Sequence, residues 1–232
     1  GSHMVERRRQ RRHAVDRQDH AHGGALADNA GQRADRGWLR WMIDYVEGEV
    51  TSPPENWAEQ LLHFWFVDHG FADWFKGGAD FDKAVTEHFA EWRDALRELP
   101  TESFLTDPHT ALAAVILFDQ VPRNAYRGTA EAFATDHLAL AIAKISVAGA
   151  FDVDLSKDER LFLYLPYEHS ENRGDQRESV RLIGQLGDPD LLKYAQDHQA
   201  MIERFGRFPH RNKALGRTDR EGEAEAVAAG NS

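Results

Sequence analysis

The chain has 232 residues, of which 41% are hydrophobic and 29% are charged, and its formal net charge at pH 7 is −11. These values are typical of a globular protein with a substantial core. The acidic balance argues against a nucleic-acid partner, and the absence of cysteine from the sequence excludes disulfides and thiolate chemistry. No apolar run is long enough to cross a bilayer and none resembles a signal peptide, so we expect a cytoplasmic protein without a membrane partner.

The two ends of the chain differ from its middle. Residues 1–36 begin with what resembles an expression-tag remnant, Gly1-Ser2-His3-Met4, and then contain almost no large apolar residues. Such a segment cannot bury enough surface to fold, so we expect a disordered basic tail. We interpret its arginine run as a solvated tail rather than a nucleic-acid arm. One helical domain is expected over residues 37–217, followed by a weakly helical C-terminal tail over residues 218–232.

The first half of that domain predicts helices separated by short breaks. Pro53-Pro54 interrupts the chain, a helix begins at Trp57, and a short aromatic piece ends at Gly77-Gly78. Two amphipathic helices are predicted from apolar residues that recur every three or four positions. The first contains Trp38, Trp41, Met42 and Tyr45, and the second contains Phe81, Val85, Phe89, Trp92 and Leu96.

The second half contains explicit helix-end signals. Asp107-Pro108 should start a helix that is apolar nearly all round and lies at the centre of the core. Ser156 and Glu159 have capping-box spacing, Asp188-Pro189 should start the last long helix, and Gly206 should end it. Further helices are expected over residues 129–148 and 174–186. Because no stretch alternates apolar and polar residues, the predicted fold class is all-α, with about eight or nine helices joined by short loops.

The first polar motif runs from Asp119 to Gly128, where the central helix is expected to end at Pro122. Its arginines, Arg123 and Arg127, either stabilise the negative end of that helix or contact a ligand. The second motif, Glu168-His169-Ser170-Glu171, follows Pro166, where the next helix should kink or stop. Its side chains suit either acid–base chemistry or a structural hydrogen-bond network.

The third motif runs from Arg204 to Asn212. Arg207 and Arg211 carry the planar guanidinium that binds carboxylate or phosphate with two hydrogen bonds, and Pro209 should fix the turn between them. The alternative is that these arginines form internal ion pairs with Glu168, Glu171 or Asp136. His198, six residues before the motif, is expected to face solvent.

Five stretches of the sequence together resemble one known family. They are His63-Phe64-Trp65-Phe66, Asp119 to Asn124 with Arg127-Gly128, Phe133 to Asp136, Leu161 to Glu171, and Arg204 to Asn212. The family that they resemble is the bacterial family catalogued as domain of unknown function 924. The resemblance covers about residues 58–217, and the region after Arg217 looks shortened or divergent. It implies a tetratricopeptide-like fold, in which antiparallel helix pairs form a right-handed array, and it implies no particular reaction.

The leading functional hypothesis is a cleft that binds a small anionic molecule, serving a hydrolase or lyase that acts on a carboxylate- or phosphate-bearing metabolite. The predicted proton-transfer residues are Glu168, His169 and His210. The predicted ligand-binding residues are Asp119, Arg123, Asn124, Arg127, Arg204, Arg207, Arg211 and Asn212. Walker, Rossmann and zincin motifs do not occur, and we predict neither a cofactor nor a metal.

Three other interpretations remain open at this point. The same cations suit an acidic peptide, as in modules of the tetratricopeptide type. They also suit a structural lattice of salt bridges without any ligand, in which single substitutions at Arg207 or Glu168 would be strongly destabilising. A minor alternative is a metal site formed by Glu168, His169 and His210. Nothing in the sequence predicts an oligomeric state.

Overall fold

A computed structural model of the chain describes residues 52–229. The predictions for residues 1–36 and for the helix from Trp38 to Tyr45 lie outside the described residues. Within residues 52–229 the chain forms nine α-helices and no β-strand, which confirms the all-α class. In the same part of the chain, no helix combines the length and the apolar character that spanning a membrane requires.

The helices follow one another with short connections, several of which are single turns of 3-10 helix. The α-helices are α2 (Trp57–His63), α3 (Phe71–Lys76), α4 (Ala79–Leu96), α5 (Pro108–Ala125), α6 (Asp136–Ala148), α7 (Lys157–Glu168), α8 (Arg173–Gly184), α9 (Pro189–Phe205) and α10 (Glu223–Ala228). A π-helix, Phe64–Asp68, continues α2 toward α3.

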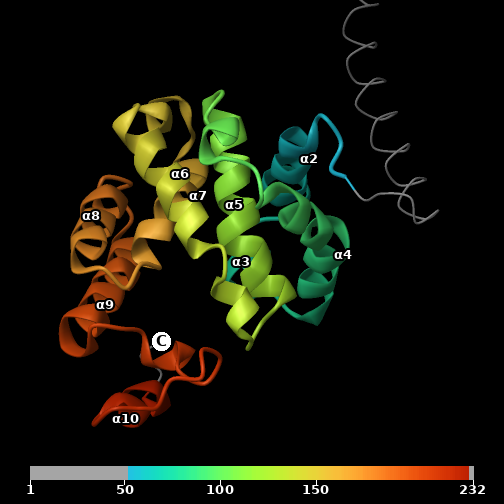
Figure 1. Cartoon of the computed structure of the whole chain (residues 1–232). Helices are drawn as coiled ribbons and strands as arrows, with labels where there is room; N and C mark the ends of the chain where they lie inside the picture. The colour runs from blue at the N-terminus through green and yellow to red at the C-terminus, as the bar shows by residue number, and fades with distance from the viewer. Residues whose placement is uncertain (1–51, 230–232) are drawn as a thin grey trace, which may run out of the picture. The chain divides into compact units, whose positions relative to one another are not determined.

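Helix α5 forms the centre of the core, as its apolar sequence predicts. Every residue from Ala111 to Pro122 is buried. The helix packs against α2, α4, α6 and α7, and Figure 1 shows it running between α4 on one side and α6 and α7 on the other. Helices adjacent in sequence, such as α4 and α5 or α8 and α9, also pack together. The right-handed, tetratricopeptide-like arrangement of these pairs remains a prediction.

The predicted helix ends are confirmed. The Asp107 carboxylate accepts hydrogen bonds from the backbone amides of His109 and Thr110 at the start of α5, and Ser156 and Glu159 form the capping box of α7. Asp188 caps α9. Gly206 ends α9 with a φ of 70°, a left-handed conformation that favours glycine.

Pro122 does not end α5, and α7 does not stop at Pro166, where a kink or a stop was expected. Helix α5 continues three residues past Pro122 to Ala125, and α7 continues past Pro166 to Glu168. Proline lacks the amide that would bond the carbonyl four residues earlier. In α5 that carbonyl belongs to Phe118, and the buried Thr135 hydroxyl donates to it at 2.7 Å. A tertiary hydrogen bond therefore replaces the missing helical one.

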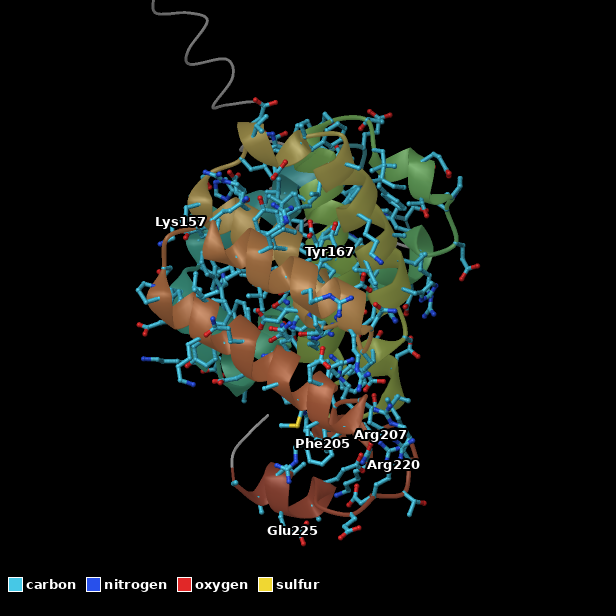
Figure 2. The ribbon with its side chains drawn as sticks, turned by 90° about the vertical axis from the view of Figure 1, so that its left-hand side faces the viewer. Lys157, Tyr167, Phe205, Arg207, Arg220 and Glu225 are labelled. Carbon is cyan, nitrogen blue, oxygen red and sulfur yellow. The ribbon has the colours of Figure 1, made fainter. Side chains whose placement is uncertain are left out.

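The C-terminal segment, expected to be a weakly helical tail, contains α10, which packs against the 3-10 turn Pro209–Arg211. Glu223 and Ala226 of α10 are buried. Figure 2 shows Arg207 and Arg220 between the end of α9 and α10, with Glu225 on the side of α10 away from α9. The segment is therefore joined to the rest of the helices by buried polar side chains.

Candidate functional site

A cavity of about 400 Å³ is lined by side chains of α3, α5, α7 and α9, with His169 and Arg127 from just beyond the ends of α7 and α5. Its volume is in the range of small-molecule sites. One part of its lining is apolar or aromatic: Phe71, Trp74, Phe75, Leu161, Leu165, Leu191 and Tyr194. The other part is polar: Lys76, Gln120, Arg123, Asn124, Arg127, Glu168, His169 and His198. The first two sequence motifs, about 40 residues apart, thus meet at one cavity.

The aromatic wall from α3 is held by the π-helix. The carbonyl of Phe64 accepts a hydrogen bond from His69 Nδ1 at 2.9 Å, and the carbonyl of Trp65 accepts one from Trp74 Nε1 at 2.8 Å. Helix α3 itself has no buried residue, but Trp74 packs edge-on against Phe66 and Phe162. The hydrogen bond and these ring contacts of Trp74 together position this wall.

Asp119 and His169 form a hydrogen-bonded pair beside the cavity. Asp119 is 1% exposed, and although burial would raise its pKa, Arg123 and His169 hold that pKa well below its usual range. The ionised carboxylate accepts from His169 Nδ1 at 2.8 Å. Nδ1 therefore carries the proton, which leaves Nε2 as the acceptor of the imidazole. Burial and Arg123 lower the pKa of His169, so the ring is a neutral base at neutral pH.

The charge of Arg123 is already balanced by carboxylates. Its guanidinium donates to both carboxylate oxygens of Asp136, at 2.7 and 3.0 Å, and lies 3.1 Å from Asp119 Oδ1. Arg211 donates to Asp136 at 3.3 Å and to the His169 carbonyl at 2.9 Å. The predicted internal ion pair of Arg211 with Asp136 is thus confirmed. Two guanidiniums and two carboxylates form a neutral cluster beside the cavity.

Neither guanidinium of this cluster forms an ion pair with Glu168. It is 6% exposed, and burial, together with the negative charge of Asp119, raises its pKa to about 8. Its closest titratable partner is His198, whose Nδ1 lies 3.4 Å from Glu168 Oε1. Glu168 is therefore a neutral carboxylic acid at neutral pH and can donate a proton into the cavity.

The expectation that His198 faces solvent is wrong. Its side chain is 20% exposed, lines the cavity and packs edge-on against Phe208. Burial lowers its pKa to about 4. Its Nδ1 donates to the Tyr194 carbonyl at 2.9 Å. A signal for this was present in the sequence, because His198 lies on the same helical stripe as Leu191, Ala195 and Ile202.

Lys76 and Gln120 also line the cavity, although the sequence predicts no ligand-binding role for either. Gln120 Nε2 donates to Asp119 Oδ2 at 2.6 Å, which the adjacency of the two residues does not predict. Lys76 ends α3 and is exposed. Its place at the cavity follows from the packing of α3, and no local motif marks it.

Several predicted site residues lie away from the cavity lining. Arg207 donates to both carboxylate oxygens of Glu223, at 2.8 and 2.7 Å. Asn212 donates to Asp219 and Glu223, and Arg204 stacks on Phe205. A ligand-binding role for these residues stays a prediction, and their observed partners are those of a structural network.

His210, predicted to transfer protons, also lies outside the lining. Its ring contacts Phe208 at a centroid distance of 5.5 Å, and burial and Arg211 lower its pKa to about 4. Within residues 52–229 no three His, Asp or Glu side chains are arranged to ligate a metal ion. The alternative site built from Glu168, His169 and His210 is therefore not formed there.

The chain is similar to a solved structure and to a family of bacterial proteins. A solved structure of a protein of unknown function from Agrobacterium tumefaciens, ATU0120, is 34% identical, with a TM-score of 0.70. The similarity covers 74% of this chain and 97% of that one. No curated protein matches.

The family described as bacterial protein of unknown function, DUF924, matches residues 61–231. The match extends beyond Arg217, where the sequence had looked shortened, and includes α10. Because it spans most of the chain and agrees with the five sequence stretches, the chain belongs to the DUF924 family.

Proposed function

We propose that the cavity between α3, α5, α7 and α9 binds a small anionic metabolite, and that His169 and Glu168 carry out acid–base chemistry on it. One observation carries the proposal. A neutral carboxylic acid and a neutral imidazole, oriented by the Asp119 carboxylate, line the same cavity. Environments that push the pKa values of neighbouring groups apart are typical of acid–base pairs in active sites.

The pair suits a hydrolase or a lyase. In hydrolysis, His169 accepts a proton from a water molecule as the water oxygen attacks, and Glu168 gives its proton to the leaving group. In elimination, His169 removes a proton next to a carbonyl group, and Glu168 protonates the departing oxygen. Arg123 supports these roles by keeping Asp119 ionised, and Arg211 pairs with Asp136, the second carboxylate that Arg123 contacts.

The size of the cavity favours a metabolite over a peptide. About 400 Å³ accommodates one small molecule, whereas a bound peptide requires an extended groove.

The test is a turnover screen of carboxylate- and phosphate-bearing metabolites that contain ester, amide or eliminable C–O bonds. His169→Asn and Glu168→Gln should each lower kcat by about 100-fold or more. The kcat/KM of the wild type should fall on the alkaline side as Glu168 ionises near pH 8, and Glu168→Gln should lack that decline. His210→Asn is the matched control, because His210 is buried and titratable but does not line the cavity.

The outcomes separate the hypotheses. Full activity in both His169→Asn and Glu168→Gln, or loss of activity in His210→Asn alone, contradicts the proposal. Absence of turnover, with no metabolite raising the Tm of the wild type, contradicts it as well.

A further inference from the structure

We infer that the ligand of this cavity is a monoanion with an apolar body, whose charged group lies at the mouth beside Lys76 and Arg127 and whose inner end presents an uncharged hydrogen-bond acceptor to Glu168. The inference rests on the proposed function and deepens it by naming the substrate class. It also separates the anionic group from Arg207 and Arg211, which the sequence predicts to bind it and which do not line the cavity.

The burial of the lining residues distinguishes an inner end of the cavity from its mouth. At the inner end, Glu168 is 6% exposed and Leu161 is 3% exposed. At the mouth, Phe71 is 55% and Tyr194 is 62% exposed, and Lys76 is exposed as well. A ligand that fills the cavity therefore has one desolvated end near Glu168 and one end in contact with water near Lys76.

The inner end is unsuited to a charged group. Arg123 is bound by Asp119 and Asp136, and Asp136 also pairs with Arg211. No net positive charge of this cluster is left for a ligand. A buried anion there would lack a counter-ion, which is strongly unfavourable. The proton of Glu168 is instead available to a neutral acceptor such as a carbonyl oxygen.

The mouth, in contrast, has an excess of positive charge. Lys76 makes no ion pair with any other residue of the described part of the chain, 52–229. Arg127, 65% exposed at its side chain, pairs with Asp82 at 2.8 Å and keeps donors facing solvent. The two cations, Lys76 and Arg127, and the one carboxylate, Asp82, leave one net positive charge, which matches one anionic group.

The walls between the two ends require an apolar body. Trp74, Leu165 and Leu191 also line the cavity. Apolar surface buried against these side chains contributes about 25 cal/mol per Å². The indole of Trp74 is fixed by its bond to the Trp65 carbonyl, so this wall is already ordered before a ligand binds.

The experiment is calorimetric titration at pH 7 with four eight-carbon probes. 7-Oxooctanoate has a carboxylate at one end of an apolar chain and a ketone near the other. Octanoate lacks the ketone, and 2-octanone lacks the carboxylate. Suberate carries a second carboxylate in place of the ketone. We expect 7-oxooctanoate to bind most tightly. Suberate should bind about tenfold more weakly than octanoate, because its second charge must enter the inner end.

Lys76→Gln should weaken octanoate binding by about threefold to fivefold and leave 2-octanone unchanged, as expected for an exposed charge pair. The control is Lys83→Gln, which removes the same charge from an exposed α4 lysine that pairs with Glu87. The inference is overturned if suberate binds as tightly as octanoate, if Lys76→Gln binds octanoate as the wild type does, or if no probe binds. The proposed function fails separately, when the probes bind as expected but the pH–rate profile is the same in Glu168→Gln, His169→Asn and the wild type.

Discussion

At the level of single residues, the pKa values of two buried carboxyl groups beside one cavity are shifted in opposite directions. Asp119 has Arg123 and His169 within hydrogen-bonding distance and stays ionised. Glu168 has only the weakly basic His198 nearby and feels the charge of Asp119, so it stays protonated. The difference arises from the number of cations that each carboxyl group contacts, because both are buried.

Glu168 should make the stability of the protein depend on pH. Its pKa is about 8 in the folded protein against 4.5 ordinarily, so the folded state holds a proton that the unfolded chain releases. Its stabilising contribution is fully present below pH 4.5 and is lost as the pH rises to about 8. The unfolding free energy of the wild type relative to Glu168→Gln should fall with pH, with a slope of about 1.4 kcal/mol per pH unit at pH 6.5 that declines to about half of this at pH 8.

Denaturant unfolding at several pH values measures this slope. The effects of His198 and His210 lie mainly between pH 4 and 6.5 and cancel in the comparison with Glu168→Gln, which keeps both histidines. Glu178→Gln is the control, because Glu178 is paired with Arg181 near the surface and its pKa is lowered. An identical slope in the wild type and Glu168→Gln would show that Glu168 is ionised.

At the level of secondary structure, the last turn of α5 is stabilised by side chains. The carbonyl of Phe118 accepts from Thr135, that of Asp119 from Arg123 and that of Gln120 from Asn124. These bonds allow the helix to pass through Pro122. They also hold Gln120 and Arg123 at the cavity and Asp119 beside it, so the helix end and the site depend on the same contacts.

Thr135→Val should destabilise the protein by about 1–3 kcal/mol, because it leaves the buried Phe118 carbonyl without a donor. The cost should be smaller in a Pro122→Ala background, where the new backbone amide can bond that carbonyl. A double-mutant cycle in urea measures the difference. Thr135→Ser, which keeps the hydroxyl, is the control. Equal costs of Thr135→Val in both backgrounds would contradict this account of α5.

At the level of the whole molecule, the buried carboxylate of Glu223 is one of several polar groups that join the C-terminal segment to the end of α9 and the turn after it. Glu223 accepts hydrogen bonds from Arg207, Asn212 and the amide of Arg220, and these interactions lower its pKa to about 2. None of these residues lines the cavity. The segment therefore contributes to stability through a network that is distinct from the site.

Glu223→Gln should lower the Tm, because it leaves Arg207 without its counter-ion. Glu225→Gln, the same change at an exposed position of α10, should leave the Tm unchanged. The pH dependence assigned to Glu168 should persist in Glu223→Gln, since the two networks share no residue. Calorimetry over pH 6.5–8 tests both statements, and equal Tm values for the two variants would contradict the structural role of Glu223.

The sequence by itself determined the all-α class, the helix starts at Asp107 and Ser156, the glycine end at Gly206 and the central place of α5. Each of these depends on local capping chemistry or on periodicity, which neighbouring residues encode. It also marked Glu168, His169 and Arg123 as chemically unusual, since polar groups at the ends of apolar helices need partners.

Only the tertiary structure decided which of these residues share a cavity. Thr135, 17 positions from Phe118, supplies the hydrogen bond that Pro122 cannot make in α5, and proline geometry alone predicts a helix end that does not occur. Asp119 and Asp136 balance Arg123, Glu223 pairs with Arg207, and His198 turns inward against Phe208. Charge balance and burial are properties of residues brought together from distant parts of the chain, so no local pattern contains them.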